Sequence, residues 1–267
     1  MLVTKYLRPE SLSDAYKVLT EEKKSLIIAG GAWIKLSIKK IDTLISIDNL
    51  NLNQIEITKD SLEIGSMVTL RELEINKEVN ELYDGILARA IHKIMGINIR
   101  NIATIGGSIM GKFPFSDIIP ALLVMDTKLI FYKQGEITLE EYLETPKMEK
   151  DILLKVIIKK EKGVGFFKKV AKTPLDFSII NIAISKCNNK FKVCLGSTPY
   201  LAKLAINTME YLNKHSKISE EIINSAIKIM IQEIKFNKNV RSSKEYKEEL
   251  AKVYLKRGLK KVIAHVG

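Results

Sequence analysis

The stretch from Ile99 to Asp117 contains the most informative motif of this chain: Ile-Arg-Asn-Ile-Ala-Thr-Ile-Gly-Gly-Ser-Ile-Met-Gly-Lys-Phe-Pro-Phe-Ser-Asp. Isoleucines are interleaved with Thr104, the Gly106-Gly107 pair and Ser108. Glycine lets main-chain N–H groups approach a ligand closely, and short hydroxyls add hydrogen bonds without filling the space. The composition therefore predicts backbone that lies against a flat or charged ligand, although an isolated Gly-Gly pair is more often a turn between strands.

Two further glycine sites precede this motif, each at the end of a predicted strand. Ala29-Gly30-Gly31 follows an apolar strand at 26–29, and Gly65-Ser66 follows a strand at 62–64. A helical turn predicted at 33–39 would place the first pair at a strand-to-helix junction, where free N–H groups bind anions. None of these sites is a Gly-x-Gly-x-x-Gly or Walker motif. Together they indicate a backbone-rich cradle for a planar, phosphate-bearing ligand.

The composition is that of a globular protein without obvious metal or nucleic-acid chemistry. The 267 residues are 46% hydrophobic and carry a net charge of +12, but only six of the 43 basic residues are arginine, which disfavours nucleic-acid recognition. Residues 235–261 hold ten basic and three acidic residues, which indicates a solvated helix face or a docking face for an acidic partner.

The three histidines are scattered. The two cysteines fit no disulfide, zinc or iron–sulfur spacing. No apolar run could span a membrane and no signal peptide is recognisable, so we expect a cytoplasmic protein.

The hydrophobic patterns predict mixed helices and strands, with a domain boundary near residue 160. Helices are expected from a Ser11 cap, from a Thr69–Glu72 capping box, and over 82–95 and 117–124; strands are expected at 43–47, 129–132 and 152–158. Beyond 160, strands are expected at 166–170, 179–185 and 191–195, and helices at 201–212, 219–234 and 244–262.

The 99–117 stretch resembles the signature of the FAD-binding medium subunits of molybdenum hydroxylases, the xanthine dehydrogenase and carbon monoxide dehydrogenase family. Ala29-Gly30-Gly31 resembles the family's first flavin loop, and 64–73 resembles the segment after the second. Later parts are similar to the family's C-terminal domain: Phe167-Lys168-Lys169-Val170 with Asp176, Gly196 with Thr198-Pro199, and Arg241-Ser242-Ser243 with Tyr246-Lys247 and Leu250. The resemblance covers nearly the whole chain.

The resemblance implies an α+β fold with two domains. Residues 1–160 would form a two-lobed FAD-binding domain of the vanillyl-alcohol-oxidase (PCMH) type, with lobes at roughly 1–55 and 56–160. Residues 161–267 would form a smaller α/β C-terminal domain.

The resemblance also implies which residues contact FAD. The first loop would hold the pyrophosphate through Ile27, Ala29, Gly30, Gly31, Ala32, Trp33 and Ile34. The second motif would bind from the other side through Thr104, Gly106, Gly107 and Ser108, continuing to Gly111 and Ser116. Asp117 would fix the ribose or adenine, or instead cap the helix that follows it. Leu153 would pack on the flavin ring. Lys168 would tune the flavin, or be one more surface lysine.

Several positions depart from the family pattern. Ala32-Trp33 stands where a Thr-Asp or Thr-Glu pair is common, Ser108 replaces Asn, and Gly111 and Phe113 replace small polar residues. Trp33 could stack on the cofactor or only fill the interface between the lobes. We therefore expect the backbone cradle to be kept and the side-chain contacts with FAD to differ.

The chain lacks both the cysteine set of a ferredoxin-type domain and the length of a molybdopterin domain. The resemblance therefore implies one subunit of a larger oxidoreductase, in which FAD takes electrons from the [2Fe–2S] cluster of a small partner and passes them to NAD⁺ or another acceptor. Molybdopterin would lie in a large partner subunit, and no side chain of this one is expected to be catalytic. The alternatives are a self-contained FAD-dependent oxidoreductase and a basic, cofactor-free binding protein.

Overall fold

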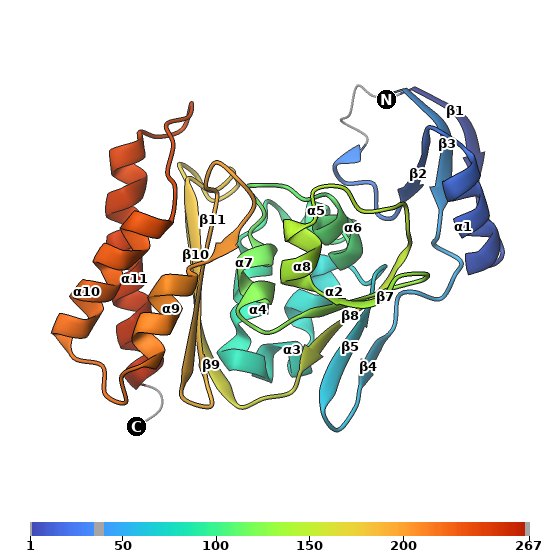
Figure 1. Ribbon diagram of the computed structural model, residues 1–267. Coiled ribbons are helices and arrows are strands. Elements are labelled where there is room, and N and C mark those ends of the chain that lie inside the picture. Colours follow the sequence, from blue (N-terminus) through green and yellow to red (C-terminus); the bar gives the residue numbers. More distant parts are fainter. Residues whose placement is uncertain (1, 35–39, 265–267) are drawn as a thin grey trace. The chain divides into compact units, whose positions relative to one another are not determined.

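The computed structural model describes residues 2–34 and 40–264, which form three β-sheets with helices around them (Figure 1). The chain divides into two compact units that are not continuous in sequence. The first contains Met1–Leu73, Gly96–Gly111 and Thr127–Lys159; the second contains Glu74–Met95, Lys112–Asp126 and Lys160–Gly267. Among the described residues, no helix combines the length and the apolar character needed to cross a bilayer.

The first unit begins with a small parallel sheet in the order β1-β3-β2, made of β1 (Leu2–Leu7), β3 (Lys40–Ser46) and β2 (Ser25–Ile28). Helix α1 (Leu12–Glu21) starts at Ser11, whose side chain accepts the Asp14 N–H as predicted. Ala15 and Leu19 on the buried face of α1 pack against Ile45 of β3. This packing holds the strand that leads into the first glycine pair.

The larger sheet of the first unit is antiparallel, in the order β4-β5-β8-β6-β7. Its strands are β4 (Ile55–Ile57), β5 (Ser61–Gly65), β8 (Leu153–Lys159), β6 (Lys128–Phe131) and β7 (Gly135–Thr138). The short helices α5 (Ile97–Arg100), α6 (Ile105–Met110) and α8 (Leu139–Glu144) belong to the same unit, and α6 contacts β8. Helix α2 (Leu70–Ile75) starts at the predicted capping box, because Thr69 and Glu72 exchange hydrogen bonds.

The second unit is built on an antiparallel sheet in the order β12-β11-β10-β9. The strands are β9 (Gly163–Val170), β10 (Ile180–Cys187), β11 (Lys190–Gly196) and β12 (Lys203–Leu204). Helices α9 (Ile206–Asn213), α10 (Glu220–Glu233) and α11 (Lys244–Ala264) lie on one face, and α4 (Ile86–His92) and α7 (Ile118–Leu123) lie on the other (Figure 1). The unit also contains α3 (Lys77–Glu81) and the 3₁₀ turn η2 (Leu82–Gly85).

Two predicted helices differ from the structure, and the alternative of a turn at Gly106-Gly107 is excluded. The helix expected over 82–95 is wrong at its start, because Tyr83, Asp84 and Gly85 have positive φ and α4 begins only at Ile86. The helix expected from 201 begins at Ile206, since Lys203 and Leu204 pair with β11. The Gly106-Gly107 segment is not a turn but lies inside α6. Most of the helical turn expected at 33–39 lies outside the described residues.

Candidate functional site

The three glycine segments meet within the first unit. The backbone of Gly30 lies directly against the carbonyl of Ile102, so that an added Cβ would stand 1.4 Å from that oxygen. Gly106 is packed in the same way against Ser66, whose carbonyl oxygen would be 2.6 Å from an added Cβ. Thr69 and Thr104 form an isolated antiparallel bridge. The segments 29–34, 65–69 and 102–108 therefore form one assembly, and glycine is required where they touch.

The loop after β2 presents main-chain amides without a partner. The N–H groups of Gly30, Gly31 and Ala32 donate no hydrogen bond to the described chain. Gly31 has φ +67°, a left-handed conformation that costs little only for glycine. Gly30 is exposed and Ala32 is buried. Consecutive free amides in a turn with left-handed residues form a concave anion-binding surface, so this loop has the chemistry that the sequence predicts for it.

The N-terminus of α6 differs, because its first amides are already bonded within the protein. The N–H of Ile105 donates to the Val68 carbonyl at 3.0 Å and that of Gly106 to the Ser66 carbonyl at 2.9 Å. The Thr104 side chain caps the helix by accepting the Gly107 N–H at 3.1 Å. The Ser108 hydroxyl donates back to the Thr104 carbonyl at 2.8 Å. What α6 offers a ligand is the exposed, side-chain-free backbone of Gly107.

The remaining predicted residues of the first unit lie around these segments. Ile27 is half-buried in β2, and Trp33 and Ile34 are half-buried behind the loop. Leu153 is 4% exposed in β8, opposite Phe131 at a register shift. Gly111 is exposed and ends α6. The buried hydroxyl of Ser66, a residue not predicted as a site residue, has no hydrogen-bond partner among the described residues.

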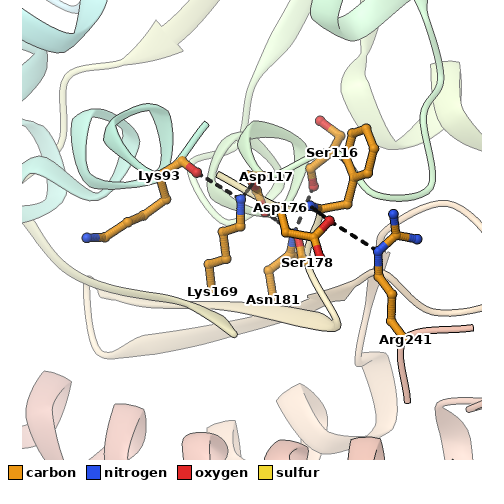
Figure 2. A network of polar contacts seen from close by, with 9 residues as sticks. Lys93, Ser116, Asp117, Lys169, Asp176, Ser178, Asn181 and Arg241 are labelled. Carbon is orange, nitrogen blue, oxygen red and sulfur yellow. Dashed lines mark hydrogen bonds and ion pairs between the residues drawn. The ribbon is translucent and has the colours of Figure 1, made fainter. Parts of the chain in front are cut away.

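Asp117 belongs to the second unit and is the centre of a buried polar network (Figure 2). Its Oδ1 accepts hydrogen bonds from the Ser178 hydroxyl at 2.5 Å and from Asn181 Nδ2 at 2.8 Å. Its Oδ2 pairs with the Lys169 ammonium at 3.0 Å, and both side chains are about 95% buried, with 5% and 6% exposed. Asp117 stands at the N-cap position of α7, as the alternative predicted, but its side chain makes no capping hydrogen bond to the described helix.

The same network fixes the loop before α7. Asn181 Nδ2 also donates to the Ser116 carbonyl at 3.0 Å, and Lys169 Nζ donates to the Lys93 carbonyl at 2.8 Å. Beside it, Arg241 Nε pairs with Asp176 at 3.4 Å (Figure 2), which brings together two residues singled out by the resemblance. Lys169, Ser178 and Asn181 were not predicted from the sequence as site-forming residues.

Lys168 and Lys169 point to opposite faces of β9, as successive strand residues must. Lys168 is exposed, and its Nζ lies 5.4 Å from the centre of the Tyr254 ring on α11. Lys169 is the lysine that reaches Asp117. The strand period was the available signal: it predicts that one lysine of the pair faces α11 and the other faces α7. The role of Lys168 near the flavin stays a prediction.

The described residues contain no group of three or more histidine, cysteine or acidic side chains that could hold a metal. The thiol of Cys187 is hydrogen-bonded to Glu161 at 3.3 Å, and burial is the largest cause of its raised pKa.

Two domain-family models match the chain. The FAD binding domain in molybdopterin dehydrogenase matches residues 2–159, and the CO dehydrogenase flavoprotein C-terminal domain matches residues 165–262. The xanthine dehydrogenase FAD-binding subunit of Escherichia coli O157:H7 is 24% identical over 98% of this chain and 97% of that protein.

Solved structures show the same fold. A Cu,Mo-CO dehydrogenase chain superposes with a TM-score of 0.89 at 18% identity, covering 98% of each chain. A chain of quinoline 2-oxidoreductase from Pseudomonas putida 86 gives a TM-score of 0.87 at 19% identity, covering 98% of this chain and 97% of that one.

Proposed function

This chain is a member of the FAD-binding subunits of molybdenum hydroxylases, and we propose that it relays electrons from a partner's [2Fe–2S] cluster through FAD to NAD⁺ or another acceptor. The family, the α+β fold with its FAD-binding and C-terminal flavoprotein domains, and FAD as the cofactor are the ones predicted from the sequence, and they are confirmed. The route of the electrons and the identity of the partners are the proposal.

The observation that carries the proposal is the row of amides at Gly30, Gly31 and Ala32, which have no partner among the residues that the structure describes. This loop fits a pyrophosphate, because an anion supplies the acceptors that these N–H groups lack and glycine lets it approach closely. FAD, when bound, supplies the one- and two-electron chemistry, and the protein supplies position and electrostatics. We propose that Ile27, Ala29, Trp33 and Ile34 flank this contact.

We propose a different role for the second motif. Gly107 would approach the cofactor with bare backbone, and Thr104, Gly106 and Ser108 would hold that backbone in place through the cap and the packing against Ser66. Gly111 would continue the surface at the end of α6, and Leu153 would contact the flavin ring.

Asp117 keeps some capacity for a ligand. A carboxylate offers about four acceptor positions, and three are used by Ser178, Asn181 and Lys169. We propose that the remaining position accepts a ribose hydroxyl, beside Ser116, and that Lys169 keeps the carboxylate charged and oriented for this contact.

The proposed partners are supported by the name of a relative. The similar protein from Escherichia coli O157:H7 is named as the FAD-binding subunit of a xanthine dehydrogenase. We propose a large molybdenum-binding subunit, where substrate is hydroxylated, and a small [2Fe–2S] subunit, which passes the electrons on.

Purification from the native source tests the proposal. We expect a yellow protein with flavin absorbance near ~450 nm that co-purifies with subunits carrying molybdenum and iron. Flavin reduction by the partner's substrate, followed by reoxidation with NAD⁺, would support the relay. A chain that stays colourless after incubation with FAD would contradict the proposal, and so would full turnover of a small substrate by the isolated yellow chain.

A further inference from the structure

Lys247, near the start of α11, is a fully buried lysine without an acidic partner among the described residues. The residue is 1% exposed, and its Nζ donates to the Ser197 carbonyl at 3.3 Å and to Asn237 Oδ1 at 3.2 Å. Both acceptors are neutral, and no carboxylate of the described residues forms an ion pair with this amine. Burial alone lowers its pKa. Lysine is almost never fully buried unless it is paired.

Two buried serine hydroxyls, on the two segments that contact this amine, have no hydrogen-bond partner among the described residues. The hydroxyl of Ser197, whose carbonyl already accepts from Lys247, is buried and has no partner among the described residues. The buried hydroxyl of Ser242 has none there either. Ser242 lies on the same segment as Asn237, and its N–H donates to Asn239 Oδ1 at 3.1 Å. An ammonium has three hydrogens, and two of them are used here.

Neither serine hydroxyl has an acceptor among the described residues, and both acceptors of the Lys247 amine are uncharged. What the cluster lacks is an acceptor that also brings negative charge.

We propose that Lys247, Ser197 and Ser242 bind a small inorganic anion, with chloride as the fitting ion. The enclosure of all three polar groups favours a small ion over a phosphate or a carboxylate. The anion would hold together the segments 197–202 and 235–243. Because the Ser197 N–H donates to the Pro114 carbonyl at 3.0 Å, it would also steady the loop that leads to Asp117. The site is separate from the flavin contacts proposed above and does not depend on them.

Thermal unfolding of the purified chain in chloride and in gluconate, at equal ionic strength, tests the site. We expect a saturable rise in Tm of about 2–4 °C with chloride, the shift for a ligand several-fold above its Kd, and no rise with gluconate. Lys247→Met should abolish the difference, and Lys247→Arg should retain it. Lys252→Met is the matched control, because Lys252 lies on the same helix but pairs with Glu249 at the surface.

Bromide replaces chloride as the direct probe. Crystals of the unaltered protein grown in bromide should show an anomalous peak beside Lys247 Nζ, a result that does not require any variant to fold. Equal Tm values in chloride and gluconate together with no bromide peak would overturn the proposal and assign the position to water. Should Lys247→Met fail to fold, Ser197→Ala combined with Ser242→Ala is expected to weaken the chloride effect, and an unchanged effect would count against the site.

Discussion

Segments 29–32 and 104–108 of the first unit both pair glycines with small residues. They differ in whether their main-chain amides are hydrogen-bonded within the described chain. The amides of Gly30, Gly31 and Ala32 have no partner in the described chain. Those of Ile105, Gly106 and Gly107 are bonded to Val68, Ser66 and Thr104. Similar composition therefore serves ligand contact in one segment and packing in the other.

Glycine has three uses in these segments that a sequence motif does not distinguish. A glycine can be needed because another backbone occupies the space of a Cβ, because φ is positive, or because a ligand comes close. Gly30 and Gly106 show the first use, Gly31 the second, and Gly107 is the candidate for the third. Alanine substitutions at these four positions test this assignment.

Gly30→Ala should have the largest effect. Its Cβ would stand 1.4 Å from the Ile102 carbonyl oxygen, so two backbones must separate. We expect the free energy of unfolding to fall by at least about 3 kcal/mol, with loss of FAD binding as a consequence, measured by urea unfolding. Gly96→Ala is the control, because no atom of the described residues lies within 4 Å of its added Cβ. Equal stability of the two variants would contradict the close packing of the segments.

Gly106→Ala should come next. The added methyl would meet the Ser66 backbone at 2.6 Å, inside the buried contact that orients α6. We expect a loss of about 1–3 kcal/mol in unfolding free energy. Fluorescence titration of the folded fraction should then show a loss of FAD affinity only to the extent that α6 is displaced. Loss of FAD affinity at unchanged stability would instead assign Gly106 a direct ligand contact.

Gly31→Ala should be milder. The left-handed φ of +67° costs alanine about 1–2 kcal/mol, whereas the nearest atom, Ile28 Cδ1 at 3.2 Å, is the mobile end of a side chain. Gly31→Asn is the matched variant, because asparagine tolerates this region better. We expect thermal unfolding to rank the stabilities as wild type, Asn, Ala. A ranking with Ala above Asn would show that the conformation of the loop is not what requires glycine.

The sequence was enough to predict the helix caps and strands that depend only on neighbouring residues. The caps at Ser11 and Thr69, and the strands that became β6, β8 and β9, depend on neighbouring residues and on the strand period. The left-handed turn at Tyr83–Gly85 does not depend on neighbouring residues in this way. Tyr83 is buried against Gly163 and Gly165, which lie far along the chain, and tertiary packing overrides a tyrosine's aversion to positive φ.

The site divides in the same way. The motifs identified the cradle, because its glycines are contiguous in sequence. The partners of Asp117 could not be identified, since Ser178 and Asn181 lie 61 and 64 residues away, and neither is unusual in its own strand or loop. Nor does any pattern in the sequence show which amides are already bonded, because Val68 and Ser66 accept through main-chain carbonyls that every residue has.

Gly107→Ala should change stability least and is the sharpest test of the comparison. Gly107 is exposed, and an added Cβ would meet only Thr104 Oγ1 at 3.1 Å. The higher helix propensity of alanine, about 0.5–1 kcal/mol, offsets that tight contact, so unfolding free energy should stay within about 0.5 kcal/mol of wild type. FAD affinity, measured by flavin fluorescence, should nevertheless fall about tenfold, the cost of roughly 1.4 kcal/mol for holding the cofactor away.

Measuring both the unfolding free energy and the FAD affinity of Gly107→Ala distinguishes a ligand contact from a packing role. The other variants change both quantities together. A stable protein with weakened FAD binding places the cofactor against α6, because no folded-state contact was lost. A stable protein with unchanged FAD binding would leave α6 as a packing element only, with the cofactor held by the loop at Gly30–Ala32. A destabilised protein would mean that Gly107, like Gly106, is needed by its neighbours, since the only atom near its Cβ is the Thr104 hydroxyl that caps the helix.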